Sequence, residues 1–563
     1  MGRVTLWPDG WRLPYLSEIK WGRAVLLSTV DGGVDLEDAK KTISAEVESM
    51  QGGTIILSTP FERLPSTGKN HDLFRIDLGP NIVANKRIDR MLDELQRCLG
   101  TNQAKEPRDQ IQKLNYNANL CGLLLPGAPL ADALYADIQE SSAAAFKWDP
   151  LERARPNPKA DISRASTEKD IGADPYDARS QIHSAKSLNR SQQGAVKQVL
   201  EERRRFNLIQ GPPGTGKTTT ASATICGWLK SNRGPVLASA FSNRGCDNIA
   251  GQLHALGVRV LRMGLCSAKE PYSLETRLQE VGMKRGDKGL KKVLESVDVV
   301  AATCIGCGMG PLDSLTFPFI VIDEAAQVIE PAVILPLGKG AVQAVMVGDQ
   351  CQLPATVLSQ EAQAKGLDVS MFDRLLSMGM DYTLLTDQYR MHPSISAFPS
   401  WRFYRGELKN AVTDADRQLP PGMPFRSNLV FLHVDAIESS GGASKKNFDE
   451  ADCAVWSAGL AIKSGIAGGD IGIISPYGAQ VSLIRNSLGQ AAQNLIQVST
   501  VDAFQGSERE VIIFSLVRAN KRGDVGFVAD WRRLNVALTR AKRLCVVIGH
   551  IPTWLAANSG LLR

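Results

Sequence analysis

The stretch "NLIQGPPGTGKTTT", residues 207–220, decides the fold of the larger part of this chain. Residues 211–218 match the pattern GxxxxGK[ST], in which glycines let successive backbone N–H groups turn toward phosphate oxygens. A strand-like apolar run precedes the pattern and a helical stretch follows it, so a helix N-terminus would add a favourable dipole for an anion. A glycine-rich turn that binds no nucleotide is the alternative. The complete pattern in this context favours a phosphate-binding loop.

Two side chains of this loop have roles that follow from their chemistry. The Lys217 ammonium is placed to reach the β- and γ-phosphates of a nucleotide, and the Thr218 hydroxyl to ligate Mg²⁺. The candidate nucleotide-binding residues of the loop are Gly211, Pro212, Pro213, Gly214, Thr215, Gly216, Lys217, Thr218 and Thr219.

A second stretch, "FPFIVIDEAAQ" at residues 317–327, has an apolar run that ends in two carboxylates. Such a run suits a strand buried on both faces of a parallel sheet, and open α/β sheets bind ligands at the carboxyl ends of their strands. A solvated loop with two acids is the alternative. Beside a phosphate loop, Asp323 becomes the acid that holds Mg²⁺ through water. Glu324 becomes the base that polarises the attacking water, because adjacent residues on an extended segment point apart.

The bulk composition is that of an ordinary globular protein. The chain has 563 residues, of which 43% are hydrophobic and 22% charged, and its formal net charge is +6. This mild positive charge permits a polyanionic partner without demonstrating one. No apolar run approaches membrane-spanning length, and the N-terminus has neither a signal-peptide core nor an N-myristoylation signal. We therefore expect a cytoplasmic or nuclear protein without a membrane partner.

The 10 cysteines are scattered, which suggests a reducing compartment. One pair, Cys304 and Cys307, has CxxC spacing. We interpret it as two buried thiols, because nothing supplies the second pair of ligands that a zinc site needs.

The pattern along the chain predicts four segments. Residues 20–80 read as short strands with turns, which fit a small sheet or barrel, and "NKRIDRMLDELQRCL" with "PRDQIQKL" suggests a helical hairpin. Proline-broken polar sequence follows. From residue 188 strands and helices alternate, and the series repeats after residue 380. We predict a small β-rich domain with a stalk-like hairpin in 1–115, a linker in 116–187, and α/β parallel-sheet domains in 188–380 and 381–563.

Two arginines of the last domain suggest how it works with the first. Arg390 lies in "LTDQYRMHPSI" and Arg540 in "DWRRLNVALTRAKR". A phosphate-loop domain that hydrolyses efficiently often borrows an arginine from a neighbouring domain or protein. Arginines delivered by an attached domain would make closure of the cleft depend on nucleotide, as in a motor. A surface ion pair is the alternative for either arginine.

An ordered set of motifs carries a family resemblance over about residues 188–550. The motifs are "LNRSQQGAV", "GPPGTGKT", "ASAFSNRGCDNIA", "AATCIGCG", "VIDEAAQ", "VGDQCQLPATV", "DQYRMHP", "ISPYGAQ", "VSTVDAFQGSE" and "RRLNVALTRAK". The series resembles superfamily 1B helicases, and within them the up-frameshift-like group, which includes the nonsense-mediated-decay RNA helicase and senataxin. The resemblance implies two tandem RecA-like domains after a small β-barrel on a helical stalk. It is weak over residues 1–187.

The same resemblance implies roles for residues around an ATP and Mg²⁺ site. Gln192 would recognise the adenine edge, and Glu508 would contact the ribose. Gln327 and Gln350 would sense the γ-phosphate, and Arg390 and Arg540 would be arginine fingers. The residues matching motifs that line the nucleic-acid track are Ser242, Asn243, Thr303, Ser475, Pro476, Tyr477 and Thr500. Contacts of this kind position a strand without reading its sequence. For Thr303 and Thr500 taken singly, a satisfied strand-end hydroxyl is the simpler interpretation.

The chain departs from the family in three places. Phe448 stands where better-known members often have an arginine. The segment 265–296 is shorter than the helical insertion of relatives, and its basic residues suit either nucleic-acid contact or a solvated helix face. These are Lys269, Arg277, Lys284, Arg285, Lys288, Lys291 and Lys292. The Cys-rich zinc module of the decay helicase has no counterpart, which weakens an assignment to that pathway.

Two functions remain open from the sequence. The first is an ATP-dependent helicase that moves 5′ to 3′ on single-stranded RNA or DNA, as the family does, and that works as a monomer. The second is an ATP-gated clamp on RNA or DNA that remodels complexes without processive unwinding. A scaffold independent of nucleotide is disfavoured, because every catalytic position is filled. The choice between RNA and DNA depends on geometry around the 2′-hydroxyl.

Overall fold

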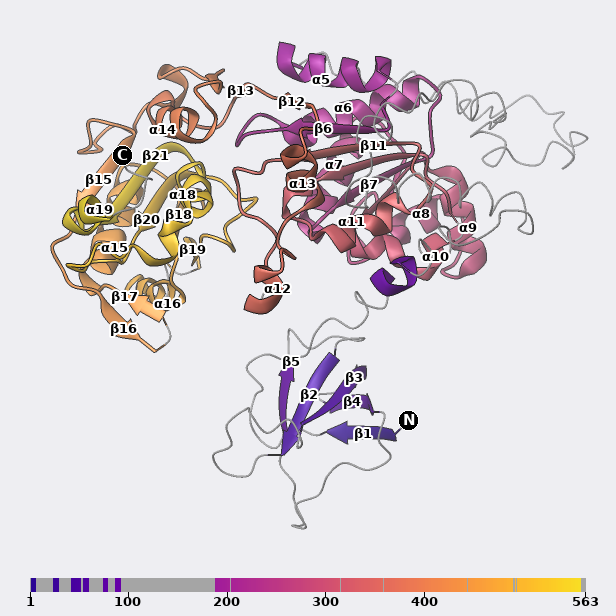
Figure 1. Cartoon of the computed structure of the whole chain (residues 1–563), viewed down its shortest axis with the longest axis horizontal. Coiled ribbons are helices and arrows are strands. Elements are labelled where there is room, and N and C mark those ends of the chain that lie inside the picture. Colours follow the sequence, from indigo (N-terminus) through magenta and orange to yellow (C-terminus); the bar gives the residue numbers. More distant parts are fainter. Residues whose placement is uncertain are drawn as a thin grey trace, which may run out of the picture. The chain divides into compact units, whose positions relative to one another are not determined.

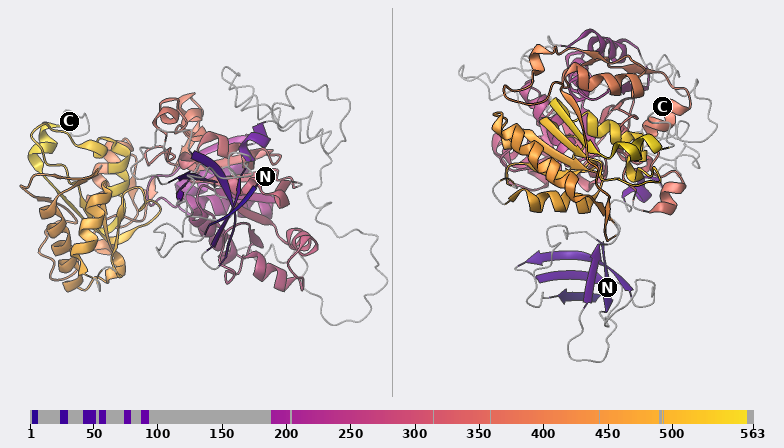
Figure 2. Two further views of the ribbon diagram at one scale, coloured as in Figure 1. Left: turned by 90° about the horizontal axis from the view of Figure 1, so that it is seen from below. Right: turned by 90° about the vertical axis from the view of Figure 1, so that its left-hand side faces the viewer.

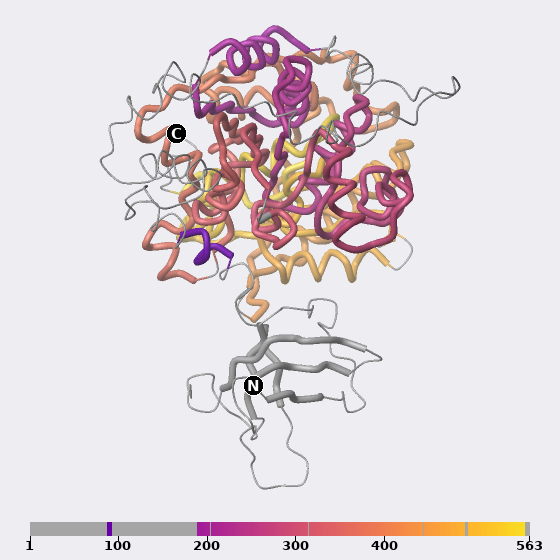
Figure 3. The backbone as a smooth tube through the Cα atoms, turned by 90° about the vertical axis from the view of Figure 1, so that its right-hand side faces the viewer, coloured from indigo at the N-terminus to yellow at the C-terminus, as the bar shows by residue number. Residues whose placement is uncertain are grey.

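The computed structural model describes residues 188–557, apart from short gaps, and six segments nearer the N-terminus. The gaps are residues 203, 314, 358, 443, 490, 491 and 493, and the N-terminal segments are 2–6, 24–29, 42–51, 54–59, 74–78 and 87–92. The chain divides into two compact units, Met1–Asn102 and Gln103–Arg563. The path of residues 188–557 can be followed in Figure 3.

The N-terminal unit contains a five-stranded antiparallel sheet in the order β1-β4-β3-β2-β5. Its strands are β1 (Gly2–Leu6), β2 (Ala24–Thr29), β3 (Thr42–Gln51), β4 (Thr54–Thr59) and β5 (Phe74–Leu78). The expected small sheet is therefore present, with β1 and β3 as strands that the sequence patterns did not single out. Closure into a barrel and the helical hairpin stay predictions, and the linker of 116–187 lies outside the described residues.

A seven-stranded parallel sheet organises the region after residue 188, in the order β12-β6-β11-β10-β7-β9-β8 (Figure 1). The strands β6, β7 and β11 are mainly apolar and fully buried, as expected for strands covered on both faces. The strands are β6 (Phe206–Gln210), β7 (Val236–Ala240), β8 (Val260–Arg262), β9 (Val299–Thr303), β10 (Phe319–Asp323), β11 (Gln343–Gly348) and β12 (Tyr382–Leu384).

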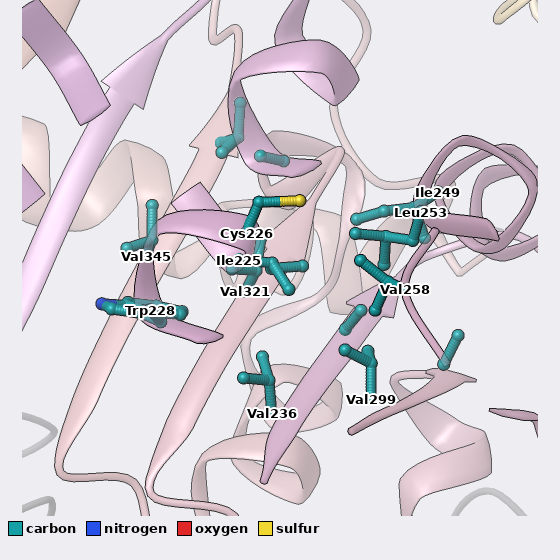
Figure 4. Packing of buried hydrophobic residues seen from close by; sticks show 14 of the residues in the cluster. Ile225, Cys226, Trp228, Val236, Ile249, Leu253, Val258, Val299, Val321 and Val345 are labelled. Carbon is teal, nitrogen blue, oxygen red and sulfur yellow. The ribbon is translucent and has the colours of Figure 1, made fainter. Parts of the chain in front are cut away.

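Helices α5, α6 and α7 share one hydrophobic core with this sheet. Trp228 of α6 is fully buried there, its ring centroid lies 5.3 Å from that of Phe319, and its indole N–H donates to Gln343 Oε1 at 3.1 Å. Figure 4 shows Trp228 beside Val345 and Val321 of the sheet. The helices of this region are α5 (Arg190–Glu201), α6 (Lys217–Lys230), α7 (Asn243–Ala255), α8 (Leu274–Glu280), α9 (Asp287–Ser296), α10 (Gly310–Asp313), α11 (Glu330–Leu337), α12 (Gln360–Ala364) and α13 (Met371–Ser377).

A second parallel sheet follows, in the order β15-β21-β20-β18-β19, with helices on both faces (Figure 2). Along β20, Ile512 and Phe514 pack in the core that includes α14 and α18, while Val511 and Ile513 pack in the core of α15 and α16. The elements are β13 (Asp387–Gln388), α14 (Pro393–Phe403), β14 (Lys409–Asn410), β15 (Leu429–His433), β16 (Ser439–Gly441), β17 (Ser444–Lys446), α15 (Phe448–Lys463), β18 (Ile471–Ser475), α16 (Gly478–Ser487), β19 (Gln497–Thr500), β20 (Arg509–Ser515), α18 (Trp531–Leu538), β21 (Ala541–Gly549) and α19 (Ile551–Ala556).

Two tandem parallel-sheet α/β regions are therefore confirmed. The limits proposed for the four domains stay a prediction.

A buried carboxylate supports the end of β20. Glu450 in the first turn of α15 is fully buried, and its Oε2 accepts hydrogen bonds from Ser515 Oγ at 2.7 Å and from Val517 N at 2.8 Å. Val517 has φ = +71°, which is strained for a β-branched residue. Burial raises the pKa of Glu450 to about 7, and the two hydrogen bonds only partly offset this.

Replacing this carboxylate should change how stability depends on pH. Because the folded-state pKa lies above the ordinary value of 4.5, Glu450 carries no ionisation cost below about pH 4.5 and the full cost above about pH 7. The cost is about 3 kcal/mol for a shift of this size. We expect Glu450→Gln to be more stable than the parent at pH 8 and similar to it at pH 5. Urea unfolding at both pH values measures this, and an identical difference at both would contradict the assignment.

Candidate active site

The phosphate loop joins β6 to α6 and depends on two glycines. Gly214 and Gly216 have φ = +77° and +78°, in the region that favours glycine. A Cβ on Gly214 would lie 2.7 Å from Arg390 Cβ, and one on Gly216 would lie 2.5 Å from Gln192 Nε2. Both positions thus need glycine for conformation and for close approach.

Two side chains of the loop donate to acceptors at the carboxyl edge of the sheet. Lys217 Nζ donates to the Gly211 carbonyl at 2.6 Å, and Thr218 Oγ1 donates to Asp323 Oδ2 at 2.7 Å. Burial lowers the pKa of Lys217, although the carboxylates of Asp349 and Asp323 oppose this. The lysine is therefore a buried cation that a bound anion would stabilise.

The two acids after β10 have different surroundings. Asp323 is buried and accepts from the Glu324 N–H at 2.9 Å, and burial raises its pKa. Glu324 has φ = +56°, a strained conformation for a residue with a Cβ. Its pKa rises to about 7, first because of burial and then because of the charge of Asp323. Perturbed, strained carboxylates of this kind are typical of functional sites.

The Glu324 carboxylate lies against the first turn of α7. Ser242 caps this helix by accepting from Gly245 N at 2.9 Å, and its hydroxyl donates to Glu324 Oε2 at 3.4 Å. A Cβ on Gly245 would lie only 2.9 Å from the same oxygen. On the other side, Glu324 Oε1 is 3.9 Å from the Cβ position of Gly506, which belongs to the loop between β19 and β20.

A cavity of about 400 Å³ collects these groups with residues of the second half of the chain. Its size falls within the range of small-molecule sites. The lining residues are Pro213, Gly214, Gly216, Lys217, Thr218, Thr219, Asn248, Glu324, Gln327, Gln352, Tyr389, Arg390, Arg417, Gly506, Glu508, Arg540 and Lys542.

Both predicted finger arginines reach this cavity, by different routes. Arg390 pairs with Glu508 at 2.5 Å and donates to the Thr539 carbonyl at 3.0 Å. Arg540 is almost fully buried and donates to the Val536 carbonyl at 2.9 Å. Burial lowers its pKa to about 9, and the charge of Arg390 adds to this effect.

Glu508 lies between two cations. Lys542 Nζ is 3.1 Å from its Oε1, while Arg390 holds Oε2. Burial alone would raise the pKa of Glu508, but these two charges outweigh it and the pKa lies below its ordinary value. The carboxylate that was expected to meet a ribose is thus ion-paired in this structure.

The three predicted glutamines have different positions relative to the cavity. Gln327 lines the cavity, but Gln350 is not among its lining residues. Gln352, two residues later, is: its Nε2 donates to Asp349 Oδ2 at 2.6 Å, and its Oε1 accepts from Arg540 at 3.2 Å. Gln192 is buried behind the loop, where its amide donates to the Thr215 carbonyl at 2.9 Å and its Oε1 accepts from Asn189 N.

Several lining residues were missed by reasoning on the sequence. Tyr389, Gln352 and Lys542 lie within the quoted motifs, so their place in these motifs could have identified them as site residues. Arg417 lies in none of them. It reaches the cavity because its guanidinium donates to the carbonyls of Arg390 at 3.1 Å and Tyr389 at 3.2 Å. No local pattern marks such a contact.

Thr218 and Asp323 fit a magnesium ion as a partial ligand set. A hydroxyl and a carboxylate oxygen stand 2.7 Å apart beside the cavity. Among the described residues, no group of three or more His, Cys, Asp and Glu side chains could hold a metal. In the usual Mg²⁺ site, one or two protein oxygens are supplemented by phosphate and water.

The candidate nucleic-acid residues lie at the carboxyl ends of strands in both sheets. Thr303 pairs in register with Ala240, just before Ser242, and Ser475 pairs with Thr500. Asn243 is exposed and accepts from Arg262 Nη2 at 2.9 Å. Each sheet therefore brings its own candidates together.

Some of these side chains are not open to a ligand. Ser475 is fully buried and Tyr477 is 3% exposed. The hydroxyl of Thr303 accepts from Gly306 N at 3.0 Å and that of Thr500 from Ala503 N at 3.3 Å, as expected for satisfied strand-end hydroxyls. Pro476 is partly exposed between Ser475 and Tyr477.

One direct contact joins the strand-end loops of the two sheets. Arg244, in the first turn of α7, donates from Nη1 to Ser507 Oγ at 2.8 Å. Ser507 stands next to Glu508, and Arg244 stands two residues after Ser242. The turn near the candidate nucleic-acid residues is thus linked to the loop that holds Glu508.

The remaining expectations concern single positions. Phe448 begins α15, is about half exposed, and has Lys446 Nζ 4.8 Å from its ring centroid; it does not line the cavity.

Arg277 is buried and donates to the Val260 carbonyl, so it is not part of the basic surface of 265–296. Cys304 and Cys307 are buried free thiols whose pKa values burial raises to about 12.

Within the described residues, no helix has both the length and the apolar character needed to cross a bilayer.

Comparison with protein families finds two matches, each described as an AAA domain. One covers residues 187–285 and 267–360, and the other covers 367–552. Together they span both parallel sheets and every residue of the cavity.

Individual relatives are similar over about two thirds of this chain. The regulator of nonsense transcripts 1 homolog of Arabidopsis thaliana is 37% identical over 409 residues, which are 64% of this chain and 32% of that protein. The homolog of Drosophila melanogaster is 37% identical over 406 residues, covering 64% and 34%. The ATP-dependent helicase upf1 of Schizosaccharomyces pombe is 34% identical over 422 residues, covering 66% and 45%. The chain therefore spans about a third to a half of the length of these relatives.

Among solved structures, the crystal structure of Arterivirus nonstructural protein 10 (helicase) aligns with a TM-score of 0.36 and 14% identity, covering 65% of this chain and 63% of that one. This alignment is too loose to bear on the site. The sequence matches are sufficient: over about two thirds of its length the chain is homologous to proteins named regulator of nonsense transcripts 1 and upf1, and its resemblance to the up-frameshift-like group of superfamily 1B helicases is confirmed.

Proposed function

We propose that this protein is an ATP-dependent helicase or translocase on single-stranded RNA or DNA. One observation carries the proposal: Lys217 and Glu324 of the first sheet face Arg390 and Arg540 of the second half across one cavity. Phosphoryl transfer requires alignment and charge neutralisation, and these four side chains supply both signs of charge around the same space. Homology to proteins named ATP-dependent helicases supports the same conclusion.

The chain's own residues divide the work of hydrolysis. Backbone N–H groups of the loop and the Lys217 ammonium bind the phosphates, and Thr218 and Asp323 would hold Mg²⁺. The metal, when bound, neutralises phosphate charge. Glu324 orients the attacking water and accepts its proton, for which a pKa near 7 is well suited. Gln352, rather than Gln350, is the glutamine placed to contact the γ-phosphate region, because it lies between Asp349 and Arg540.

The two arginines act on charge that develops during transfer. Arg540 already lies beside Gln352, whereas Arg390 is paired with Glu508. We infer that a bound nucleotide exchanges this pair, so that Glu508 meets the ribose and Arg390 meets phosphate. Because the phosphate loop belongs to the first half of the chain and both Arg390 and Glu508 to the second, the exchange would couple nucleotide binding to the arrangement of the two sheets.

Nucleic acid would bind along the carboxyl ends of the strands. The exposed Asn243, the partly exposed Pro476, and the polar ends of β9 and β19 suit backbone contacts. Movement from 5′ to 3′ and action as a monomer are inferred from the family resemblance. The alternative is an ATP-gated clamp without processive unwinding, and a strand-displacement assay on a partly double-stranded substrate distinguishes the two.

Strand binding has a short structural route to the catalytic base. Ser242 stands next to Asn243 and hydrogen-bonds Glu324, and Arg244 contacts Ser507. A nucleic-acid strand that contacts this turn would therefore shift the groups that hold Glu324. We propose that single-stranded nucleic acid stimulates ATP hydrolysis through this turn.

Two substitutions test the hydrolytic site. Lys217→Ala should abolish turnover, because the phosphates lose their main side-chain cation. Glu324→Gln should still bind ATP but fail to hydrolyse it, because only the water-activating carboxylate is lost. Steady-state ATPase rates and nucleotide affinity, each measured with and without single-stranded RNA and DNA, check both. Turnover of Glu324→Gln at the parent rate would refute the assignment of the base.

A third substitution tests the arginine fingers. Arg540→Ala should lower strand-stimulated hydrolysis on the order of 10³-fold, with a smaller effect on ATP affinity, because a finger acts mainly on transition-state charge. Phe448→Ala is the control: it lies outside the cavity and should keep the parent rate. Nearly normal hydrolysis by a folded Arg540→Ala protein would exclude the two-finger mechanism, and an equal loss in Phe448→Ala would show that the loss is not specific to the cavity.

A fourth substitution tests the coupling turn. Ser242→Ala should raise the ATPase rate measured without nucleic acid and reduce the stimulation measured at a saturating concentration of single-stranded nucleic acid. Ser242→Thr should keep both quantities near the parent values. Removing a helix cap by itself costs about 1 kcal/mol. Ser359→Ala controls for this, since Ser359 caps α12 through Ala362 N and does not contact Glu324. Equal stimulation in the two alanine variants would contradict the route through Ser242.

A further inference from the structure

We propose that Phe527 is a stacking platform for one base of the bound single strand, a role that rests on the proposed nucleic-acid function. Phe527 is 57% exposed and lies in the turn Gly526–Ala529, between β20 and α18. An exposed aromatic ring is ordinary when it stands alone on a surface. This one is held by contacts with Tyr477, with its own turn and with Arg533, and it lies beside residues expected to contact the strand.

Tyr477 supports the ring from below. The Phe527 N–H donates to the Tyr477 hydroxyl at 3.4 Å, and the two ring centroids are 5.5 Å apart. Tyr477 follows β18 directly after Pro476, at the carboxyl end of the strand. It was the aromatic residue expected to meet nucleic acid, but it is 3% exposed. The aromatic surface that is open at this strand end belongs to Phe527.

The turn that carries Phe527 approaches Tyr477 closely. Gly526 has φ = +57°, and a Cβ there would clash with the Tyr477 hydroxyl and the Arg518 guanidinium. The Gly526 N–H donates to Asp524 Oδ1 at 2.8 Å, and Arg518 Nη2 bonds the other oxygen of Asp524 at 2.7 Å. A ring on such a braced turn loses little conformational freedom when a base stacks on it.

A cation also contacts the ring and connects it to β19. The Arg533 guanidinium carbon is 5.8 Å from the Phe527 ring centroid. Arg533 also pairs with Asp502 at 3.3 Å, two residues beyond Thr500. Phe527 is therefore linked to the ends of both β18 and β19, the two strands of this sheet whose ends were assigned to the nucleic-acid track.

The surrounding charges suit a nucleic-acid backbone beside the stacked base. Lys521 and Arg522 are exposed on the same β20–α18 connection as Phe527. The acids nearby are engaged, since Asp502 pairs with Arg533 and Asp524 with Arg518. Exposed cations with an open ring are the combination by which proteins hold single strands without reading sequence.

The test compares binding of intact and abasic strands. Fluorescence anisotropy with labelled oligouridylate and oligothymidylate should show that Phe527→Ala binds about 5- to 100-fold more weakly than the parent, the usual effect of losing one aromatic stacking partner. Phe527→Tyr should bind like the parent because it keeps a ring. On an abasic oligonucleotide of the same length, parent and Phe527→Ala should bind alike, because only base stacking is lost.

Trp456→Ala is the matched control. Trp456 has a similar exposed fraction, 53%, and lies on α15, away from the strand ends, so its loss should leave affinity unchanged. If the parent binds the strands and Phe527→Ala binds equally well, the stacking role is wrong and the proposed function stands. An equal loss on abasic strands would also overturn stacking, and would indicate disturbed backbone contacts. If the parent binds neither strand, the proposed function itself fails.

Discussion

The parallel pairing of β6, β11, β10, β7 and β9 is the constraint on which the rest of the site depends. Because these strands run in the same direction, their carboxyl ends meet at one edge of the sheet. The register sets Asp323 beside Ala240, Ala240 beside Thr303, and Gly348 beside Gln210. The loops that follow emerge together, and they contain the phosphate loop, both acids and the first turn of α7. Residues that are far apart in sequence therefore share one small volume.

Concentrating charge at this edge has an electrostatic cost, and the structure meets it with specific hydrogen bonds. Burial raises the pKa of Asp349 and lowers that of Lys217, so burial disfavours the charged form of each side chain. Asp349 accepts from Gln352 Nε2 and from the Tyr404 hydroxyl at 2.8 Å, and Tyr404 in turn accepts from Asn535 at 2.8 Å. The network crosses from the end of β11 to α18. Hydrogen bonding to the buried Asp349 carboxylate thus ties the two halves of the chain together even without a nucleotide.

Glu508 shows the same principle on the other side of the cavity. Its two oxygens are taken by Lys542 and Arg390, so one carboxylate is shared between two cations. Nucleotide phosphate is the competing anion for these cations. A site built from exchangeable ion pairs is suited to a cycle in which contacts are made and broken, whereas a site of permanent apolar contacts would favour one state only. At the proposed strand-binding edge, turns and fixed ion pairs such as Arg518–Asp524 and Arg533–Asp502 hold the polar and aromatic groups in place.

The sequence by itself determined the phosphate loop, the acid-tipped strand and the alternation of strands and helices, because each depends on residues within one short segment. Motif order added Arg390, Arg540 and Glu508 as site residues, and all three line the cavity. Only the tertiary structure decided that Gln352 lines the cavity in place of Gln350, that Tyr477 is covered and Phe527 open, and that Arg417 reaches the site. The reason is physical: which way a side chain faces after a strand end, and whether it is buried, depends on partners from distant segments. Gln352 turns toward Asp349 and Arg540, and Tyr477 lies under a turn that begins some fifty residues later.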